Sequence, residues 1–161
     1  GFCPGNLMRD WLGRGVHYEQ GTSLALYPKV LKQMRPHISI APLSNCKFNE
    51  CKSNIRVLEG WSLAAPVVAS NVGEYKVVKN GQDGFLATTT EDWYQHLDAL
   101  ISNQQLRETL GSNGRKRVAA EFDWANSACR KPWNNLIKEL EANAFRKKWS
   151  LTDDSRRDCY D

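Results

Sequence analysis

The stretch Ile38–Ser70, ISIAPLSNCKFNECKSNIRVLEGWSLAAPVVAS, carries the pattern that decides the fold. An apolar run ends at Pro42–Leu43, a polar loop follows, and a helical segment that starts near Lys52–Ser53 leads into a second apolar run, Pro66–Ser70. This order predicts a strand, a loop, a helix and a second strand. In open α/β sheets ligands bind beyond the carboxyl ends of the strands. We therefore expect a site in the loop that follows the first apolar run.

Short apolar segments alternate with helical patterns along most of the chain. We expect strands at Gly15–Glu19, His37–Pro42, Pro66–Ser70 and Gly84–Ala87, and helices at Leu24–Met34, Ser53–Ala64, Trp93–Ile101, Leu106–Phe122 and Trp124–Phe145, the last interrupted near Pro132. Thr88 with Glu91 fits a capping box before the third helix. Strands that alternate with helices predict a parallel sheet with right-handed crossovers. The expected fold class is α/β: a partial Rossmann-like parallel sheet flanked by helices, with a long C-terminal helix.

The bulk composition narrows the class of protein. The 161 residues are 41% hydrophobic and 25% charged, which is typical of a soluble globular protein. We expect a single α/β domain over residues 1–145 and a charged, flexible tail over 146–161. No apolar run approaches the ~20 residues that span a bilayer, so we expect no transmembrane segment.

Charge and cysteine usage exclude two kinds of site. The net charge of +4 is mild, and the clusters Arg115–Arg117 and Arg146–Lys148 are interpreted as solvated surface, so no nucleic-acid partner is expected. Five cysteines, an odd and scattered set, favour a reducing, cytoplasmic compartment. Cys46 and Cys51 lack CxxC spacing and have no histidine nearby, so no zinc site is expected.

The start of the central helix has the chemistry of an anion site. A first turn carries unpaired N–H groups and the positive end of the helix dipole. Lys52 adds a cation, Ser53 a hydroxyl and Asn49 an amide, while Glu59 lies less than two turns into the helix and could accept hydrogen bonds from sugar hydroxyls. Together they indicate a nucleotide-sugar ligand. Two alternatives remain open: Lys52–Ser53 only begins and caps the helix, and Glu59 only pairs with a surface arginine such as Arg56.

Further motifs stand in a fixed order around this segment. They are Tyr27–Pro28 with Leu31, ISIAPL at Ile38–Leu43, an FNxxKSxIxxLE pattern at Phe48–Glu59, PVVAS at Pro66–Ser70, Gly73–Tyr75, GQDGFL at Gly81–Leu86, Trp93 with Leu97 and Leu100, and Leu106–Arg107 with Leu110. In this order they resemble the retaining glycosyltransferases of the GT-B fold, group 1 (family 4). The resemblance covers about Gly15 to Trp124 and lies in the second half of the C-terminal, donor-binding domain.

The resemblance implies roles for the candidate residues. Glu59 matches the family glutamate that holds the donor ribose, and Cys51 stands where the family has the glutamate that contacts the donor sugar, with Glu50 one residue early. Backbone N–H groups of Ser53, Asn54 and Ile55 would lie near the diphosphate. The expected ligand-binding set is Phe48, Asn49, Lys52, Ser53, Asn54, Ile55 and Glu59. No catalytic residue and no metal ligand is assigned.

The function implied is donor binding in a retaining transferase. The full enzyme would move a hexose from a UDP-, GDP- or ADP-sugar to a hydroxyl acceptor in glycan or polysaccharide synthesis. No cofactor and no metal is expected, because helix N–H groups and basic side chains stabilise the leaving diphosphate. The alternatives are a non-catalytic nucleotide- or protein-binding α/β module and, third, a sugar-nucleotide epimerase fragment. The expected location is cytoplasmic, with a membrane-peripheral full enzyme left open.

The resemblance also implies missing parts. We expect the chain to be truncated on its N-terminal side, to lack the acceptor-binding domain, and to be inactive alone. The exposed sheet edge would then pair with Gly15–Glu19 or with another copy. The apolar side of the terminal helix, Trp133, Leu136, Ile137 and Leu140, would pack on its own sheet or form a homo-oligomer contact.

Overall fold

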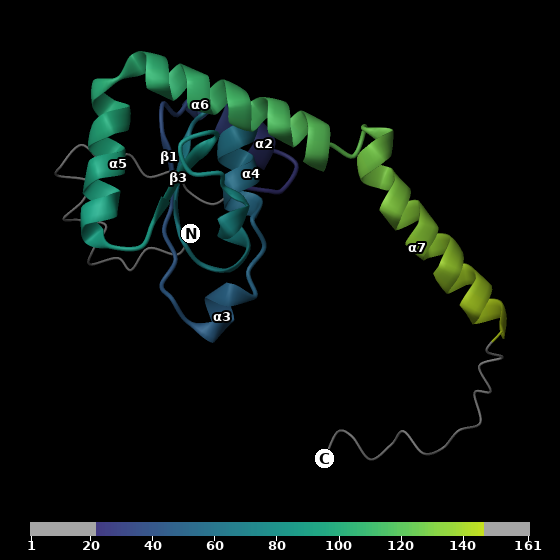
Figure 1. Ribbon diagram of the computed structural model, residues 1–161. Coiled ribbons are helices and arrows are strands. Elements are labelled where there is room, and N and C mark those ends of the chain that lie inside the picture. The colour runs from purple at the N-terminus through teal and green to yellow at the C-terminus, as the bar shows by residue number, and fades with distance from the viewer. Residues whose placement is uncertain (1–21, 147–161) are drawn as a thin grey trace.

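The computed structural model of the protein describes residues 22–146 and has a three-stranded parallel sheet at its centre (Figure 1). The strands are β1 (Ser39–Ala41), β2 (Val67–Ser70) and β3 (Gly84–Ala87), in the order β1-β2-β3. In the register of the sheet, Ser39 is opposite Val67, which in turn is opposite Gly84. Each strand lies inside a predicted segment, so the α/β fold class is confirmed. The strand expected at Gly15–Glu19 falls outside the described residues.

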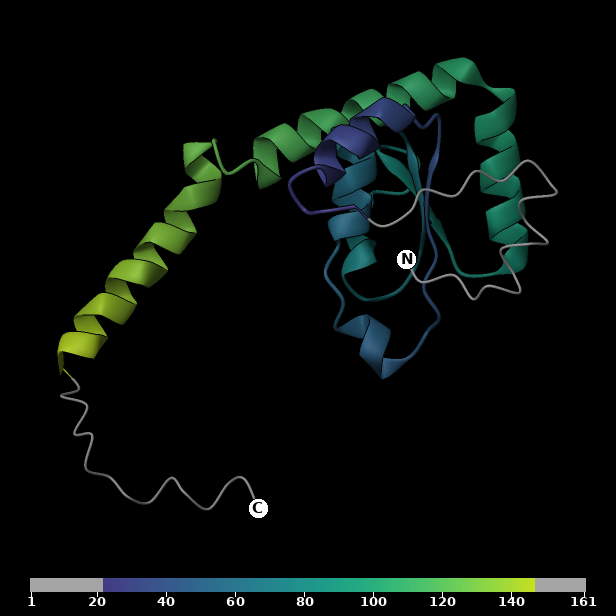
Figure 2. The same cartoon turned by 180° about the vertical axis from the view of Figure 1, so that it is seen from behind.

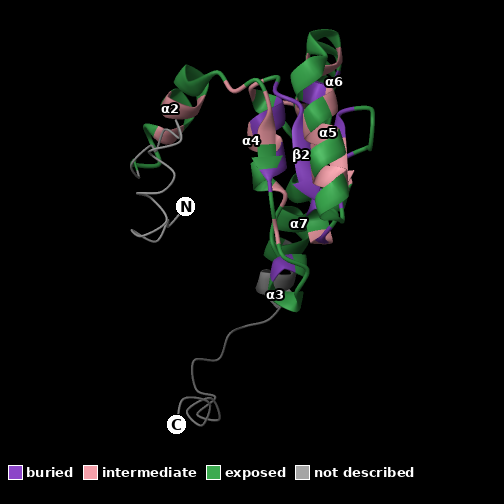
Figure 3. Cartoon of the chain, turned by 90° about the vertical axis from the view of Figure 1, so that its left-hand side faces the viewer, coloured by how far each residue is buried: buried purple, intermediate pink, exposed green. Residues whose placement is uncertain are grey.

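Helices connect the strands and cover both faces of the sheet. They are α2 (Tyr27–Met34), α3 (Lys47–Glu50), α4 (Ile55–Ser62), the 3-10 helix η1 (Gly73–Val77), α5 (Thr90–Ser102), α6 (Gln104–Arg117), the π-helical turn η2 (Val118–Phe122) and α7 (Ser127–Arg146). Figure 3 shows the buried strand β2 between α4 on one side and α5 on the other. None of the helices in residues 22–146 is both long and apolar enough to cross a membrane.

The strand β2 is buried on both faces, which explains its continuous apolar sequence. Val67 and Ala69 belong to the core on the α4 side, with Val57 and Trp61 of α4 itself. Val68 belongs to the core on the α5 side, which also contains the buried side chains Ala87, Leu100 and Leu110. Successive residues of one short strand therefore hold two helical layers to the sheet.

Two glycines allow elements to approach more closely than other residues would. A Cβ atom on Gly60 of α4 would lie 2.6 Å from Cγ2 of Val67 in β2. A Cβ atom on Gly114 of α6 would lie 2.2 Å from Cδ1 of Trp61 in α4. Trp61 is fully buried, so α4 is fixed between the sheet and α6 with little free space.

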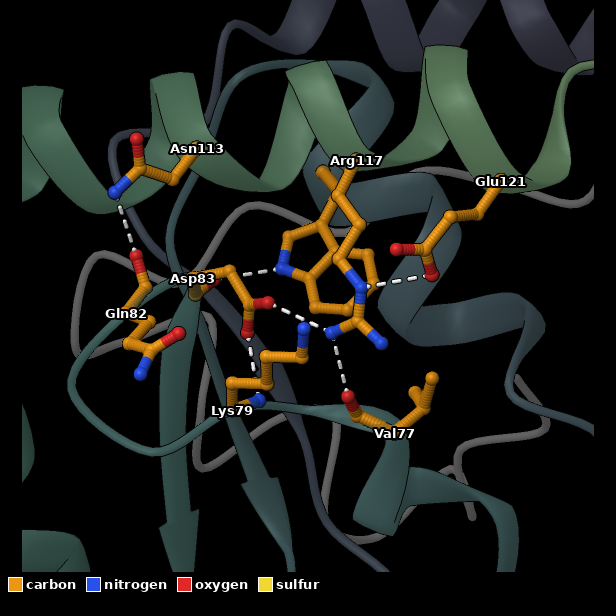
Figure 4. Close-up of polar contacts among 8 residues, drawn as sticks. Val77, Lys79, Gln82, Asp83, Asn113, Arg117 and Glu121 are labelled. Atoms are coloured by element: carbon orange, nitrogen blue, oxygen red, sulfur yellow. Dashed lines mark hydrogen bonds and ion pairs between the residues drawn. The ribbon is translucent and has the colours of Figure 1, made fainter.

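A buried ion pair links the loop before β3 to the end of α6 (Figure 4). Asp83 is 2% exposed, and its carboxylate accepts hydrogen bonds from Lys79 N and from Nη1 of Arg117, both at 2.8 Å. The same Arg117 nitrogen donates to the carbonyl oxygen of Val77 in η1 at 2.7 Å, and the guanidinium lies 5.3 Å from the centre of the Trp61 ring. This cluster ties η1, the loop and α6 together.

Several helix boundaries differ from the prediction. The helix expected from Leu24 begins at Tyr27, because Pro28 in its first turn favours the start of a helix and the preceding residues form a turn on the Ser23 carbonyl. The capping box belongs to Thr89 and Asp92, one residue later than expected. The carboxylate of Asp92 accepts from the N–H groups of both Thr88 and Thr89.

The C-terminal half also departs from expectation. The helix predicted to reach Phe122 has α-helical form only to Arg117 and ends in the π-helical turn. The predicted interruption near Pro132 is wrong: α7 runs through this residue, although an interior proline removes one N–H donor and its ring crowds the carbonyl four residues back.

The helix α7 extends away from the sheet and contacts η2 at its start (Figures 1 and 2). The expectation that its apolar side packs on its own sheet is wrong, because Trp133, Leu136, Ile137 and Leu140 are all 44–59% exposed. Among the described residues β1 is an edge strand with Ile40 59% exposed. Association of copies through this edge or through α7 stays a prediction.

Candidate functional site at the carboxyl end of the sheet

A cavity of about 480 Å³ opens beside the carboxyl end of β1. It is lined by the end of β1, the loop before α4, the first turn of α4 and one residue of η1: Ile40, Ala41, Pro42, Leu43, Lys52, Ser53, Ile55, Arg56 and Tyr75. None of these lining residues is acidic, and two are cations. The cavity therefore has the charge that an anionic ligand requires.

Side-chain hydrogen bonds fix the loop that borders the cavity. The buried hydroxyl of Ser70, at the end of β2, accepts a hydrogen bond from Leu43 N at 2.8 Å. The amide nitrogen of Asn49 donates to the carbonyl oxygen of Ser44 at 2.8 Å and to its hydroxyl at 2.9 Å. Asn49 is 7% exposed and does not line the cavity. Its geometry is that of a residue that closes the loop, and its binding role stays a prediction.

The helix α4 begins at Ile55, two residues later than expected. Asn54 is the N-cap residue, without a side-chain cap, and its carbonyl oxygen accepts from Val57 N and Leu58 N. The alternative in which Ser53 caps the helix is therefore wrong, and Ser53 lines the cavity instead. The first turn leaves the N–H groups of Ile55 and Arg56 without partners inside the helix, at the positive end of its dipole.

Glu59 lies one turn beyond Arg56, and the two form an ion pair. Nη1 of Arg56 is 3.4 Å from Oε2 of Glu59, and the same nitrogen donates to the hydroxyl of Tyr27 at 3.3 Å. The expected pairing of Glu59 with a surface arginine is thus confirmed, while its binding role stays a prediction; the pair is long and the Arg56 side chain is 55% exposed. Glu59 stands behind Arg56 rather than in the cavity lining.

The charges of Arg56 and Glu59 both affect the pKa values of two tyrosines, Tyr27 and Tyr75. Burial, followed by the nearby Glu59 carboxylate, raises the pKa of Tyr27, while Arg56 lowers it by a smaller amount. Burial also raises the pKa of Tyr75, where Arg56 opposes the shift and Glu59 adds to it. Both phenols are therefore neutral at physiological pH and can donate or accept hydrogen bonds.

The predicted residues fall into two groups. The structure brings Lys52, Ser53 and Ile55 together in the cavity. Phe48, by contrast, is 75% exposed outside it, with its ring 5.1 Å from Nζ of Lys52. Asn54 supplies the N-cap backbone described above.

Sequence reasoning missed Arg56 and Tyr75 as lining residues. A signal existed for Arg56, because it falls in the first turn of the helix expected from Ser53, beside the predicted anion site. Nothing local placed Tyr75, which reaches the cavity through tertiary packing.

Residues 22–146 contain no cluster of side chains that could bind a metal ion. No group of three or more His, Cys, Asp or Glu side chains there lies close enough to hold an ion. Cys46 and Cys51 are free and exposed. Independence from metals stays a prediction.

Comparisons with known proteins agree with one another. A family model described as "Glycosyl transferase-like" matches residues 3–130. The chain is 34% identical over 91 residues to a capsular polysaccharide biosynthesis glycosyltransferase of Staphylococcus aureus, covering 52% of this chain and 23% of the relative. It is 37% identical over 70 residues to an uncharacterized glycosyltransferase of Methanocaldococcus jannaschii, covering 42% of this chain and 20% of the relative. The chain thus spans less than a quarter of the length of these relatives.

A solved structure shares the fold. Sucrose-phosphate synthase of Thermosynechococcus elongatus matches with a TM-score of 0.63 and 23% identity, over 86% of this chain and 33% of that chain. The likeness supports the α/β architecture that the sequence predicted.

Proposed function

The chain belongs to the glycosyl transferase-like family, as its sequence motifs indicated, and from this premise we propose that the cavity beside β1 and α4 binds the nucleoside diphosphate of a sugar donor. One observation carries the proposal: Lys52, Ser53 and Arg56 line a cavity without acidic residues, at the start of a helix that has Glu59 one turn further on. Cations and hydroxyls suit phosphate, and a carboxylate suits the ribose hydroxyls.

We further propose the reaction of the whole protein. A hexose passes from a UDP-, GDP- or ADP-sugar to a hydroxyl acceptor with retention of configuration, in polysaccharide assembly. The printed function of the staphylococcal relative supports the polysaccharide context. An acceptor-binding domain is the partner that this reaction requires.

In this scheme the chain contributes positioning and charge stabilisation. Lys52 and Arg56 face the negative charge that grows on the diphosphate as the glycosidic bond breaks, and preorganised charges of this kind favour the transition state. The loop held by Ser70 and Asn49 keeps Pro42 and Leu43 against the ligand. No step needs a metal ion, since side chains and helix N–H groups carry the compensating charge.

A non-catalytic nucleotide-binding module is the second candidate. The observation that favours it is Cys51, an exposed thiol at the position where related transferases have a sugar-binding glutamate. Such a module binds the nucleotide part of the donor, and the sugar adds nothing to its binding affinity. Comparing a nucleoside diphosphate with its sugar conjugate separates the two candidates, because only a transferase site binds the conjugate more tightly.

Isothermal titration calorimetry of the purified chain with UDP, GDP and ADP tests the proposal. We expect one of them to bind, with or without EDTA, and Lys52→Met to weaken binding about tenfold, since losing one charge-assisted phosphate contact costs about 1.4 kcal/mol. Lys47→Met is the matched control, because Lys47 lies in α3 outside the cavity lining and should leave affinity unchanged. Absence of binding by all three nucleotides at millimolar concentration contradicts the proposal, as does equal weakening by the two variants.

A further inference from the structure

Arg56 lies between the cationic cavity and the carboxylate of Glu59. Its side chain lines the cationic cavity, and its Nη1 also reaches Oε2 of Glu59 at 3.4 Å and the Tyr27 hydroxyl at 3.3 Å. Glu59 is the carboxylate that we expect to hold the ribose. A single guanidinium therefore borders both the phosphate part and the ribose part of the proposed ligand.

The contact between Arg56 and Glu59 is weak by several measures. Its distance is at the long end for a hydrogen bond, it joins the residues through one nitrogen, and the side chains are 55% and 20% exposed. Exposed pairs of this kind contribute little, because water and salt screen them and side-chain entropy opposes them. A ligand can displace such a pair at low cost.

A diphosphate offers Arg56 a better partner. Arginine binds phosphate through two parallel N–H···O bonds, and bonds between ionised groups are the strongest that a side chain makes. None of the residues that line the cavity is acidic, so nothing there competes with the phosphate for the guanidinium. When Arg56 turns to a phosphate, the Glu59 carboxylate is released from this ion pair and can accept hydrogen bonds from hydroxyl groups.

We propose that Arg56 exchanges partners during binding: it leaves Glu59 for the diphosphate, and this releases the Glu59 carboxylate for the ribose hydroxyls. The inference rests on the proposed function and adds a coupling between the two halves of the ligand. Phosphate recognition then prepares ribose recognition, so a nucleoside alone binds poorly. Burial is the first cause of the raised pKa of both Tyr27 and Tyr75, while Glu59 also raises and Arg56 lowers each pKa, so both charges lie near the two phenols.

The exchange predicts effects of opposite sign for one substitution. Glu59→Gln removes the competitor of the phosphate, so inorganic pyrophosphate should bind about two- to fivefold more tightly, the range set by a weak exposed ion pair. The same substitution should weaken the nucleoside diphosphate about tenfold, since the ribose loses a charged acceptor. Calorimetry with pyrophosphate, with the best-binding nucleoside diphosphate and with its nucleoside measures all three affinities.

Two further variants separate exchange from a general charge effect. Glu74→Gln removes an exposed carboxylate in η1 and should leave pyrophosphate affinity unchanged. Arg56→Gln should weaken pyrophosphate about tenfold, and adding Glu59→Gln to it should give no gain, because the residue that changes partners is absent. All these side chains are at the surface or half-buried, so the variants should fold.

The outcomes distinguish the inference from the proposed function. If the nucleoside diphosphate binds but Glu59→Gln weakens or leaves unchanged the binding of pyrophosphate, the exchange is wrong while the donor site stands. If Glu59→Gln gives the same gain with and without Arg56, or Glu74→Gln gives an equal gain, long-range charge explains the effect and the exchange is wrong. If no nucleoside diphosphate binds, the proposed function itself fails.

Discussion

Arg117 has two carboxylate partners at nearly equal distance, and we predict that their loss has very different costs. Asp83 lies 2.8 Å away with its side chain 4% exposed, whereas Glu121 lies 2.9 Å away with its side chain 48% exposed (Figure 4). Burial raises the cost of removing one partner of a charge pair, because the remaining charge is left without compensation. Asp83→Asn and Glu121→Gln each replace a carboxylate by an amide of the same shape, so they form a matched comparison.

The magnitude follows from the surroundings of each pair. Removing one partner of a buried pair costs about 3–5 kcal/mol, because a charge is left without compensation. The Arg117 side chain is 15% exposed and keeps Glu121, and the amide introduced by Asp83→Asn still offers an oxygen to Lys79 N. The lower end of the range, about 3 kcal/mol, is therefore expected for this variant. The exposed pair with Glu121, four residues along the helix, contributes only about 0.3–0.5 kcal/mol.

Urea unfolding followed by far-UV circular dichroism measures both costs. With a slope of about 1–3 kcal/mol per molar urea, a loss of about 3 kcal/mol lowers the midpoint by about 1–3 M, whereas Glu121→Gln moves it by less than about 0.5 M. Burial lowers the pKa of Arg117, but its hydrogen bonds and charge attraction to Asp83 and Glu121 together outweigh this effect and raise the pKa, so Arg117 stays charged during the assay. Equal costs for the two variants would contradict this prediction, since burial would then not decide the cost of removing a carboxylate partner of Arg117.

Two other predictions concern helix packing and capping. Gly114→Ala should destabilise the protein by about 1–3 kcal/mol in the same urea assay, because a Cβ atom would overlap Trp61. This cost should exceed the gain from the higher helix propensity of alanine. A gain in stability would contradict the close packing of α6 on α4. The N–H groups of Thr89 and Thr88 hold the pKa of Asp92 below its ordinary value of 3.8, so its contribution to stability is full above that pH and is lost as the pH falls through the lower, folded-state pKa. The difference in Tm between the protein and Asp92→Asn should therefore be constant from about pH 7 to 5 and shrink below pH 3.8, and a difference that grows on acidification would be inconsistent with the cap.

The fold could be predicted from the sequence where burial imposes a local pattern. Residues buried on both faces of a parallel strand must be apolar, so the segment that contains β2 was recognisable. The helix α3 was missed, because four residues are too few to show a helical period. The start of α4 was placed two residues early, since the pattern of apolar residues does not specify where the backbone turns.

The site was predictable only as far as it is local. Lys52, Ser53 and Glu59 could be selected because a helix start and its first turns carry recognisable chemistry. Tyr27 is 29 residues from Arg56 in the sequence, and the two meet through tertiary packing. The same reason hides the pair of Asp83 and Arg117, which are 34 residues apart: in the sequence Asp83 belongs only to a turn.

We propose that the cavity beside β1 and α4 holds a nucleoside diphosphate. Backbone amide NMR of the isotopically labelled chain, titrated with UDP, GDP and ADP, locates the binding site residue by residue. We predict saturable shifts for at least one nucleotide, concentrated at residues 40–43 and 52–59. Saturable shifts confined to another surface, such as the cavity lined by Lys32, Arg35 and Arg115, or no saturable shift with any of the three nucleotides, would contradict it.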